Sequence, residues 1–248
     1  MISIKSPREI ELMRIAGRIV AETHELLRKA IRPGITTLEL DVIAEEYIRK
    51  SGAIPAFKDY NGFPASICSS INEQVVHGIP GPIALKDGDI IGIDIGAVYD
   101  GYYGDAARTY GIGNIDRETE RLIKVTEESF FKGIEYALPG NRLSDISHSI
   151  QKHVESNGFS VVRDFVGHGI GRSMHEDPQI PNYGLPHKGP RLAAGMALAI
   201  EPMVNQGRYA VKVREDGWTV VTADGKPSAH YENTIVITNG KPEILTLL

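Results

Sequence analysis

Five side chains of the types that bind divalent metal ions lie in, or at the edge of, segments that are otherwise apolar or rich in glycine. They are Asp94, Asp105, His168, Glu201 and Glu232. Burying an isolated carboxylate is costly, so each one requires a compensating partner. The apolar segments 90–96 and 196–202 contain no lysine or arginine that would supply it. Divalent cations would compensate all five side chains at once, and the sequence therefore predicts a two-metal enzyme.

The first two of these residues fall in a predicted β-hairpin. Residues 91–96 alternate isoleucine with glycine or aspartate, which is the period-two pattern of a strand. Asp100-Gly101 follows, a dipeptide favoured in two-residue hairpin turns between strands. If these two residues form the loop, Tyr99 opposes Tyr102. This pair then determines which residues oppose one another along the rest of the hairpin.

In that register Asp94 and Asp105 are diagonal neighbours on one face of the hairpin. Their backbones would lie roughly 7–8 Å apart. Carboxylates reaching inward from that distance could hold ions about 3.5–4 Å apart, the usual separation in two-metal sites. Gly96 and Ala107 occupy the other corners of this face, and their small size is expected to leave space for ions.

Each candidate ligand also has a structural explanation that involves no metal. A single Asp or Glu at a strand end commonly caps a turn or pairs with an arginine, and Arg108 lies close to Asp105 in the sequence. His168 alone could be a hydrogen-bonded buried histidine. Without metal, four crowded carboxylates would have raised pKa values and would lower stability.

The elements that position these residues begin with helices. Ser6, Pro7 and Glu9 form an N-cap, a proline at the first helical position and a capping-box glutamate. Thr36 and Glu39 repeat the capping box before a second helix. The first helix is expected to end before Pro33-Gly34, and the second to cover residues 37–50. Further helices are expected over roughly 117–137 and roughly 144–156, with strands over much of 53–115 and of the C-terminal part.

The order of the elements suggests an internal repeat. At an offset of 106 positions, Pro33-Gly34 matches Pro139-Gly140 and Gly52 matches Gly158. Coincidence explains so few identities about equally well, but in both parts two helices flank the Pro-Gly break and strands follow. The sequence thus favours an α+β class with internal duplication in a single domain of residues 1–248, whose halves are approximately 1–115 and 116–248.

Composition sets the broad class of protein. The 248 residues are 42% hydrophobic and carry a net charge of −5, which argues against a general nucleic-acid binder. A single cysteine, Cys68, excludes an internal disulfide framework and suits a reducing compartment. No secretory signal pattern and no apolar run of membrane-spanning length occurs, so a cytoplasmic location is expected.

Seven motifs, in order along the chain, resemble those of the type I methionine aminopeptidases in the M24 "pita-bread" metallopeptidase family. They are Val76-His77-Gly78-Ile79-Pro80, Asp94-Ile95-Gly96, residues 104–109, residues 167–171, residues 175–178, residues 199–202 and His230-Tyr231-Glu232-Asn233. The resemblance runs from the first helix to the C-terminus. It implies the duplicated pita-bread fold and removal of the initiator methionine from nascent polypeptides whose second residue is small.

The resemblance also implies a role for each predicted ligand. Asp105 and Glu232 match carboxylates that bridge two divalent ions. Asp94 matches a ligand of one ion, while His168 and Glu201 match ligands of the other. Glu201 is in addition the expected proton acceptor from the attacking water. The metals are Co, Mn, Fe or Zn, among which this ligand set does not choose.

The remaining site residues are implied by the resemblance alone. His175 matches a histidine that contacts the scissile peptide, and His77 matches one beside the new N-terminus. The pocket for the methionine side chain is expected to be lined by Tyr60, Phe63, Cys68 and Trp218. Ordinary core packing explains these pocket residues equally well when the resemblance is set aside.

Two positions depart from the best-known pattern of the family. Phe57 stands where some relatives have a smaller residue, and Met174 replaces an aromatic residue often found just before the histidine. Both are expected to alter the shape of the pocket or the tolerated second residue, and neither touches the predicted metal site.

Alternatives within and outside this class remain. Xaa-Pro aminopeptidases and prolidases share the ligands but usually carry a domain before the catalytic part, whereas here helical patterning starts near residue 6. Type II methionine enzymes carry an insertion between the last two glutamates, for which the spacing of Glu201 and Glu232 leaves no room. A binding protein on this fold would lose ligands that this chain keeps.

The expected partners are nascent chains and, transiently, the ribosome. No membrane association and no specific nucleic acid are expected, and the expected state is a monomer.

Overall fold

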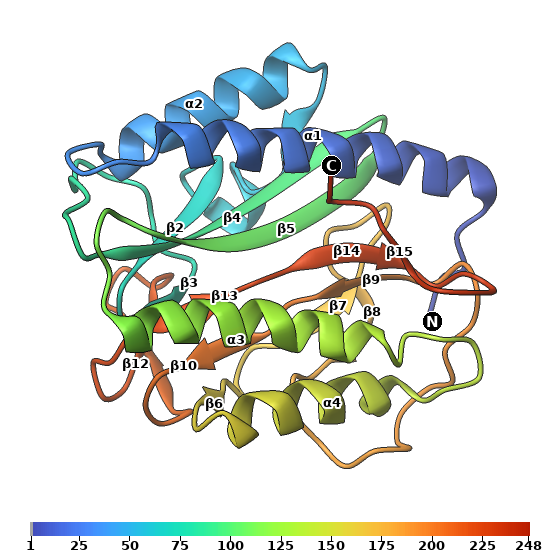
Figure 1. Cartoon of the computed structure of the whole chain (residues 1–248). Coiled ribbons are helices and arrows are strands. Elements are labelled where there is room, and N and C mark those ends of the chain that lie inside the picture. The colour runs from blue at the N-terminus through green and yellow to red at the C-terminus, as the bar shows by residue number, and fades with distance from the viewer. Residues whose placement is uncertain (1) are drawn as a thin grey trace.

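The computed structural model describes residues 2–248. Its α-helices are α1 (Pro7–Ala30), α2 (Thr37–Lys50), α3 (Arg117–Ile134) and α4 (Leu143–Ser156), and Tyr60–Gly62 form a short 3-10 helix. In Figure 1, α1 and α2 cover one side of the molecule, α3 and α4 cover the opposite side, and the strands lie between the two helix pairs. The mixed helix and sheet content expected from the sequence is confirmed.

The helix starts follow the local signals in the sequence. Ser6 and Thr36 each accept a hydrogen bond from the backbone of the residue three positions on, and Glu9 and Glu39 complete the two capping boxes as predicted. Helix α3 ends at Ile134, earlier than the predicted residue 137. The chain continues there as tight turns, in which the amide nitrogens of Tyr136 and Ala137 donate to carbonyls three residues back.

Within residues 2–248, the strands form four sheets. The first has the order β1-β4-β2, with β5 also paired to β4, and the second has the order β15-β14-β9-β7-β8. The two smaller sheets have the orders β13-β10-β6 and β11-β12-β3. The strand bounds are β1 Ile54–Pro55, β2 Ile67–Ile71, β3 Gln74–Val76, β4 Ile90–Tyr99, β5 Tyr102–Gly111, β6 Ser160–Val161, β7 Gly167–Gly169, β8 Glu176–Ile180, β9 Ala197–Ile200, β10 Met203–Asn205, β11 Val211–Val213, β12 Val220–Thr222, β13 Ser228–His230, β14 Asn233–Val236 and β15 Glu243–Ile244.

The predicted hairpin register is confirmed. Strands β4 and β5 pair antiparallel with Tyr99 opposite Tyr102, and Gly96 opposite Asp105. The turn residue Asp100 has φ of 47° and Gly101 has φ of 78°, as the favoured two-residue hairpin turn requires. The side chains of Asp94 and Asp105 therefore share one face of the ribbon.

Two large apolar clusters hold the helix pairs on the sheets. One joins residues of α1 and α2, such as Val20 and Ile48, to the buried isoleucines of β4, including Ile93. The other joins residues of α3 and α4, such as Phe130 and Ile150, to strands of the second half of the chain. Each pair of helices thus packs mainly on its own group of strands, and a third apolar cluster, which includes Tyr102 of β5 and Ala199 of β9, joins the two main sheets.

The backbone repeats at the predicted offset. Helices α2 and α4 start and end 106 positions apart, and so do β1 and β6. Gly34 and Gly140 have φ values of 91° and 92°, a left-handed conformation that favours glycine at both Pro-Gly breaks. These correspondences support internal duplication; the boundary between halves near residue 115 stays a prediction.

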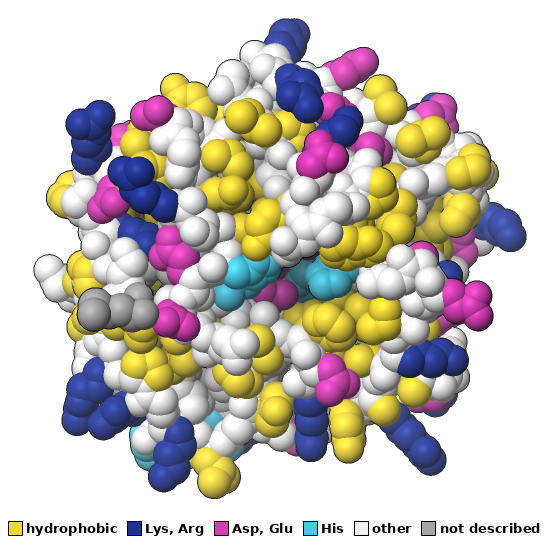
Figure 2. Space-filling model, turned by 180° about the vertical axis from the view of Figure 1, so that it is seen from behind, with side chains coloured by type: hydrophobic (Ala, Val, Ile, Leu, Met, Phe, Trp, Pro, Cys, Tyr) yellow, Lys and Arg dark blue, Asp and Glu magenta, His cyan; other side chains and the backbone are white. Residues whose placement is uncertain are grey.

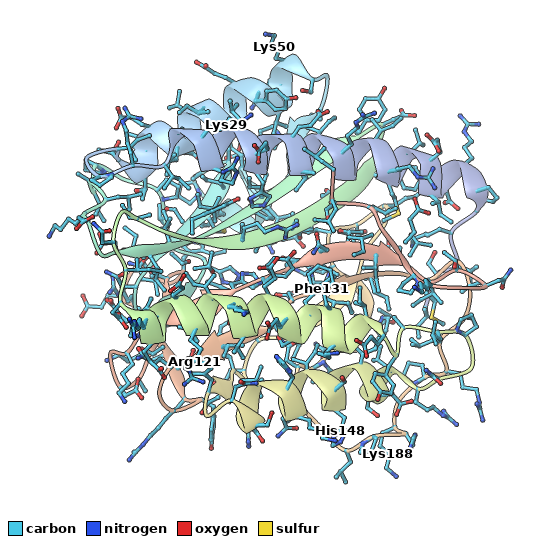
Figure 3. The ribbon with its side chains drawn as sticks, viewed as in Figure 1. Lys29, Lys50, Arg121, Phe131, His148 and Lys188 are labelled. Carbon is cyan, nitrogen blue, oxygen red and sulfur yellow. The ribbon has the colours of Figure 1, made fainter. Side chains whose placement is uncertain are left out.

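Charged side chains lie on the outside of both helix pairs. Figure 3 shows Lys50 on the outer side of α2 and Lys188 on the opposite side of the molecule near α4. Within residues 2–248, none of the helices has the length and apolar character needed to cross a membrane.

Candidate metal centre and active site

The five predicted ligands converge from both main sheets on one point between them. They are referred to below as the ligand cluster: Asp94 on β4, Asp105 on β5, His168 on β7, Glu201 directly after β9 and Glu232 directly before β14. All five line one cavity of about 210 Å³. Residues that are far apart in the sequence therefore meet, as the metal-site hypothesis requires.

Strand pairing in the second sheet explains how its three ligands come together. His168 is paired with Ala199 across β7 and β9, and Ile200 is paired with Asn233 across β9 and β14. Glu201 and Glu232 each lie one residue beyond that last pair, so they face each other where the strands separate. The side-chain amide of Asn182 donates a 3.0 Å hydrogen bond to the Glu201 carbonyl oxygen and holds this end in place.

Hydrogen bonds join the two sheets beside the ligands. The amide nitrogen of Asp105 donates to Thr234 Oγ1 at 3.0 Å, and the same hydroxyl donates to the Asp105 carbonyl oxygen at 2.9 Å. The Glu232 amide nitrogen donates to the Ala107 carbonyl oxygen at 2.9 Å. These bonds fix the spacing of Asp105 and Glu232 through the backbone, while Oδ1 of Asp105 and Oε1 of Glu232 have no hydrogen-bond partner within residues 2–248.

The ion pair between Arg108 and Asp105, considered above as the alternative to metal binding, does not form. Arg108 follows Asp105 by three positions in a strand, so the two side chains leave opposite faces of β5. The Arg108 guanidinium donates to the backbone carbonyl of Glu232 and, at 2.5 Å, to the side-chain oxygen of Asn233, and it stacks on the ring of Tyr231. It therefore supports the segment that carries Glu232 and leaves Asp105 uncompensated.

Distances within the ligand cluster fit shared cations. His168 Nε2 lies 3.5 Å from Glu201 Oε1 and 4.0 Å from Asp105 Oδ2. Two donor atoms that each lie about 2.1 Å from one ion can be at most about 4.2 Å apart. One donor atom each of Asp105, His168 and Glu232 lies within 4.8 Å of the others. Among residues 2–248, Oδ1 of Asp94, Oδ1 of Asp105 and Oε1 of Glu232 are buried and have no hydrogen-bond partner. Buried orphan oxygens of this kind are what bound cations would satisfy.

The pKa values of the four carboxyls also indicate a site that requires added positive charge. Burial, reinforced by the neighbouring carboxylates, raises the pKa of Asp94, Glu201 and Glu232 well above the usual range. Burial also raises the pKa of Asp105 to about 7. The carboxyls cannot all ionise together at neutral pH without added positive charge, as the sequence predicted for the metal-free state.

The three predicted site histidines lie at the ligand cluster as neutral rings. Burial lowers the pKa of His168 to about 4, and His168 Nδ1 contacts the Gly169 carbonyl oxygen at 2.9 Å, which leaves Nε2 facing the carboxylates. Burial lowers the pKa of His175 and lowers that of His77 to about 4. The rings of His168 and His175 are 4.3 Å apart between centroids, and Tyr60 Oη lies 2.8 Å from His175 Nδ1.

An apolar pocket opens directly onto the ligand cluster. All four predicted pocket residues, both departures from the family pattern and both additional histidines line the same cavity as the ligands: Phe57, Tyr60, Phe63, Cys68, Met174, Trp218, His77 and His175. Phe63 and Trp218 meet edge to face with ring centroids 5.2 Å apart. Figure 2 shows histidine and acidic side chains together in a hollow bordered by hydrophobic side chains.

The cysteine in this pocket is a packing residue rather than a nucleophile. Cys68 is paired with Asp94 across β2 and β4, so its side chain lies on the same face as that ligand. Burial first, and then the charge of Asp94, raises the pKa of the Cys68 thiol well above its usual range. The group stays protonated and apolar at neutral pH.

The expectation that Gly96 leaves space for ions is wrong. A Cβ at Gly96 would lie 2.8 Å from the Ala56 side chain and 2.9 Å from the ring of Phe57. The segment after β1 folds over this corner of the hairpin and fills it with the edge of an aromatic ring. Gly96 therefore allows the Phe57 ring to approach the hairpin and so shapes the apolar pocket.

One buried residue at the site was given no role from the sequence. His230 is 3% exposed, and its Nε2 lies 3.8 Å from carboxylate oxygens of both Glu201 and Glu232. The sequence did indicate that His230 lies near the ligands, because residues two apart in an extended chain share a face and His230 precedes Glu232 by two positions.

Comparison with known proteins defines the class. The model of metallopeptidase family M24 matches residues 11–239. The chain therefore belongs to metallopeptidase family M24, and the pita-bread fold expected from the sequence is confirmed.

The relatives narrow the class further. The chain is 64% identical over its full length to a methionine aminopeptidase of Clostridium perfringens, covering 100% of both chains. It is 63% identical to methionine aminopeptidase 1 of Bacillus subtilis, covering 99% of each. The crystal structure of methionine aminopeptidase from Thermotoga maritima superposes with a TM-score of 0.99 at 52% identity and covers 100% of both chains.

Proposed function

We propose that this chain removes the N-terminal methionine from polypeptides whose second residue is small, by hydrolysis of the first peptide bond. The observation that carries the proposal is one cavity in which an apolar pocket opens onto the ligand cluster. Such a cavity takes an apolar side chain and sets the adjoining peptide bond beside the ligand cluster. The relatives described above, similar over the full length of the chain, are methionine aminopeptidases.

The cofactor is a pair of divalent cations. Asp94, Asp105 and Glu232 would hold one ion, and His168 and Glu201, with Asp105 and Glu232, would hold the other. Carboxylate and imidazole donors accept Co, Mn, Fe or Zn alike. When bound, such cations act as Lewis acids and lower the pKa of water so that hydroxide forms near neutral pH.

The side chains of the site divide the proton transfers between them. As water attacks the carbonyl carbon of the first peptide bond, the Glu201 carboxylate takes up its proton and then delivers it to the leaving nitrogen. His175, a neutral ring held through Nδ1 by Tyr60, is placed to donate a hydrogen bond to the oxygen that gains negative charge. His77 stabilises the amide nitrogen of the scissile peptide bond, which becomes the new N-terminus of the product.

Selectivity for methionine comes from the pocket. Tyr60, Phe63, Cys68 and Trp218 offer an aromatic and sulfur-bearing lining that suits a flexible thioether. Phe57 and Met174 are buried in the same apolar cluster and set its size.

The cellular setting is part of the same proposal. Nascent chains with an N-terminal methionine are the substrates, and contact with the ribosome is transient. The protein acts in the cytoplasm as a monomer, with no membrane association and no specific nucleic-acid partner.

The test uses metal-stripped protein with Mn, Fe, Co or Zn restored separately. Met-Ala-Ser, Met-Lys-Ser and an Ala-Pro peptide are offered in parallel. Metal-dependent release of methionine from Met-Ala-Ser alone is expected. Cleavage of the Ala-Pro peptide instead would move the protein to the proline-specific branch, and inactivity with every metal and peptide would favour a binding protein on this fold.

A further inference from the structure

His230 is a buried histidine whose position is tightly fixed. It ends β13, where it is paired with Met203 of β10. Its amide nitrogen donates to Thr109 Oγ1 at 2.9 Å, and the same hydroxyl donates to the His230 carbonyl oxygen at 2.9 Å. Because both backbone groups are held by one side chain of β5, the ring leaves the strand at a defined point.

The Nε2 atom of this ring has no hydrogen-bond partner within residues 2–248. Leaving a buried polar atom unsatisfied costs about 1–3 kcal/mol. A folded protein normally satisfies such an atom or uses it. The neighbours of Nε2 are Glu201 Oε2 and Glu232 Oε2, each at 3.8 Å.

The two 3.8 Å distances indicate whether Nε2 is satisfied by a direct hydrogen bond or by a metal ion that it shares with the carboxylates. They are too long for a direct hydrogen bond, for which N···O distances of about 2.7–3.2 Å are normal. They fall within the span of about 4.2 Å that two donor atoms of one ion can have. One donor atom each of Glu201, His230 and Glu232 lies within 4.8 Å of the other two.

His168 offers an internal comparison. Its Nε2 lies 3.5 Å and 4.0 Å from carboxylate oxygens of Glu201 and Asp105, which is the same relation that His230 has to Glu201 and Glu232. Glu201 lies between the two rings, with Oε1 toward His168 and Oε2 toward His230. Each of the two imidazoles thus lies beside a different oxygen of the same Glu201 carboxylate.

We propose that Nε2 of His230 is a further metal ligand, so that the metal centre is built from four carboxylates and two imidazoles. The inference rests on the proposed metal centre. A second neutral nitrogen donor adds no negative charge to an already crowded site. It also shifts the ligand set toward the ions that imidazole suits, such as Zn and Fe, and away from Mg and Ca, which prefer oxygen.

The experiment measures metal binding directly, without activity. Manganese is titrated into the metal-stripped protein by calorimetry, and pulsed EPR of the bound manganese counts coordinated imidazole nitrogens. The variant is His230→Gln, which keeps a polar side chain of similar length and removes the imidazole. The matched control is His24→Gln, a buried histidine bonded to the Ala106 carbonyl oxygen and outside the ligand cluster.

The original protein and the His24→Gln control are expected to show two coordinated imidazoles. The His230→Gln variant is expected to show one and to bind manganese at least about tenfold more weakly. Thermal unfolding of the metal-stripped variants verifies that both are folded. A single imidazole in the original protein, unchanged in His230→Gln, overturns the ligand role even if affinity falls. No manganese binding by the original protein would instead refute the metal centre itself.

Discussion

At the scale of single residues, the ligand cluster combines groups that oppose one another in the metal-free chain. Asp105 illustrates the conflict, because burial raises its pKa to about 7 while its backbone is fixed by Thr234. The folded protein cannot relieve the repulsion by moving the strand. Added cations, or added protons, are the remaining ways to neutralise the charge.

This conflict predicts a pH-dependent stability of the metal-stripped protein. The folded pKa of Asp105 lies above the ordinary value of 3.8, so the folded state binds more protons than the unfolded state between about pH 4 and pH 7. The stabilisation present below pH 4 is lost as the pH rises through 7, at up to about 1.4 kcal/mol per pH unit. Urea unfolding at pH 5 and pH 8 measures it.

The Asp105→Asn variant provides the comparison. It should lose less stability between these two pH values than the original protein and should bind manganese at least about tenfold more weakly. An equal loss of stability in the two proteins would show that Asp105 does not carry the effect.

Tyr60 leads to a prediction about catalysis at the same scale. Its hydroxyl lies 2.8 Å from His175 Nδ1, so Tyr60→Phe keeps the pocket ring and removes one hydrogen bond. A lost hydrogen bond of about 0.5–1.5 kcal/mol corresponds to a decrease in kcat of roughly 2- to 13-fold, with KM changed less. Tyr47→Phe, whose hydroxyl bonds Glu22 far from the cavity, is the matched control. Equal kcat in all three proteins would exclude the orienting role.

At the scale of elements, close packing of helix α1 on strand β5 sets the position of Asp105. A Cβ at Gly104 would lie 2.7–2.9 Å from backbone atoms of Ala16 and Gly17 in α1. Backbone atoms cannot move aside as a flexible side chain can. The residue before Asp105 is therefore glycine because the helix lies directly on the strand there.

The Gly104→Ala variant should therefore affect both folding and metal binding. Overpacking of this kind costs about 1–3 kcal/mol of unfolding free energy. The displaced strand should also weaken manganese binding, measured by calorimetry. Gly81→Ala is the control, since a Cβ there meets nothing within 4 Å. Full metal affinity in Gly104→Ala would show that the ligand position does not depend on this contact.

The elements also show which features of the fold and of the site could be predicted from the sequence. The hairpin of β4 and β5 was predictable because the turn and the alternation are local, and the capped starts of α1 and α2 were predictable for the same reason. The role of Gly96 was not, because Phe57 reaches it from a loop 39 positions away. The approach of His230 to Glu201 depends on the pairing of β10 with β13, which no local pattern specifies.

At the scale of the whole molecule, the site depends on contacts between the two main sheets. Asp94 and Asp105 come from one sheet, and His168, Glu201 and Glu232 come from strands or strand ends of the other. Arg108 and Thr234 already join the sheets without metal. The overall fold is therefore expected to persist when metal is removed, while cations held by the ligand cluster would add cross-links between the sheets that the unfolded chain cannot reproduce.

Metal removal should consequently lower the unfolding temperature without abolishing the fold. An ion present at 100 times its Kd stabilises the folded state by about 2.7 kcal/mol. For a chain of this size each kcal/mol shifts Tm by roughly 2–4 °C, so chelation should lower Tm by roughly 5–10 °C. Calorimetric scans with manganese, with chelator, and with sodium at matched ionic strength measure the difference. An equal Tm in manganese and chelator would contradict a cation that links the sheets, whereas loss of the folded transition in chelator would show that Arg108 and Thr234 do not hold the sheets together alone.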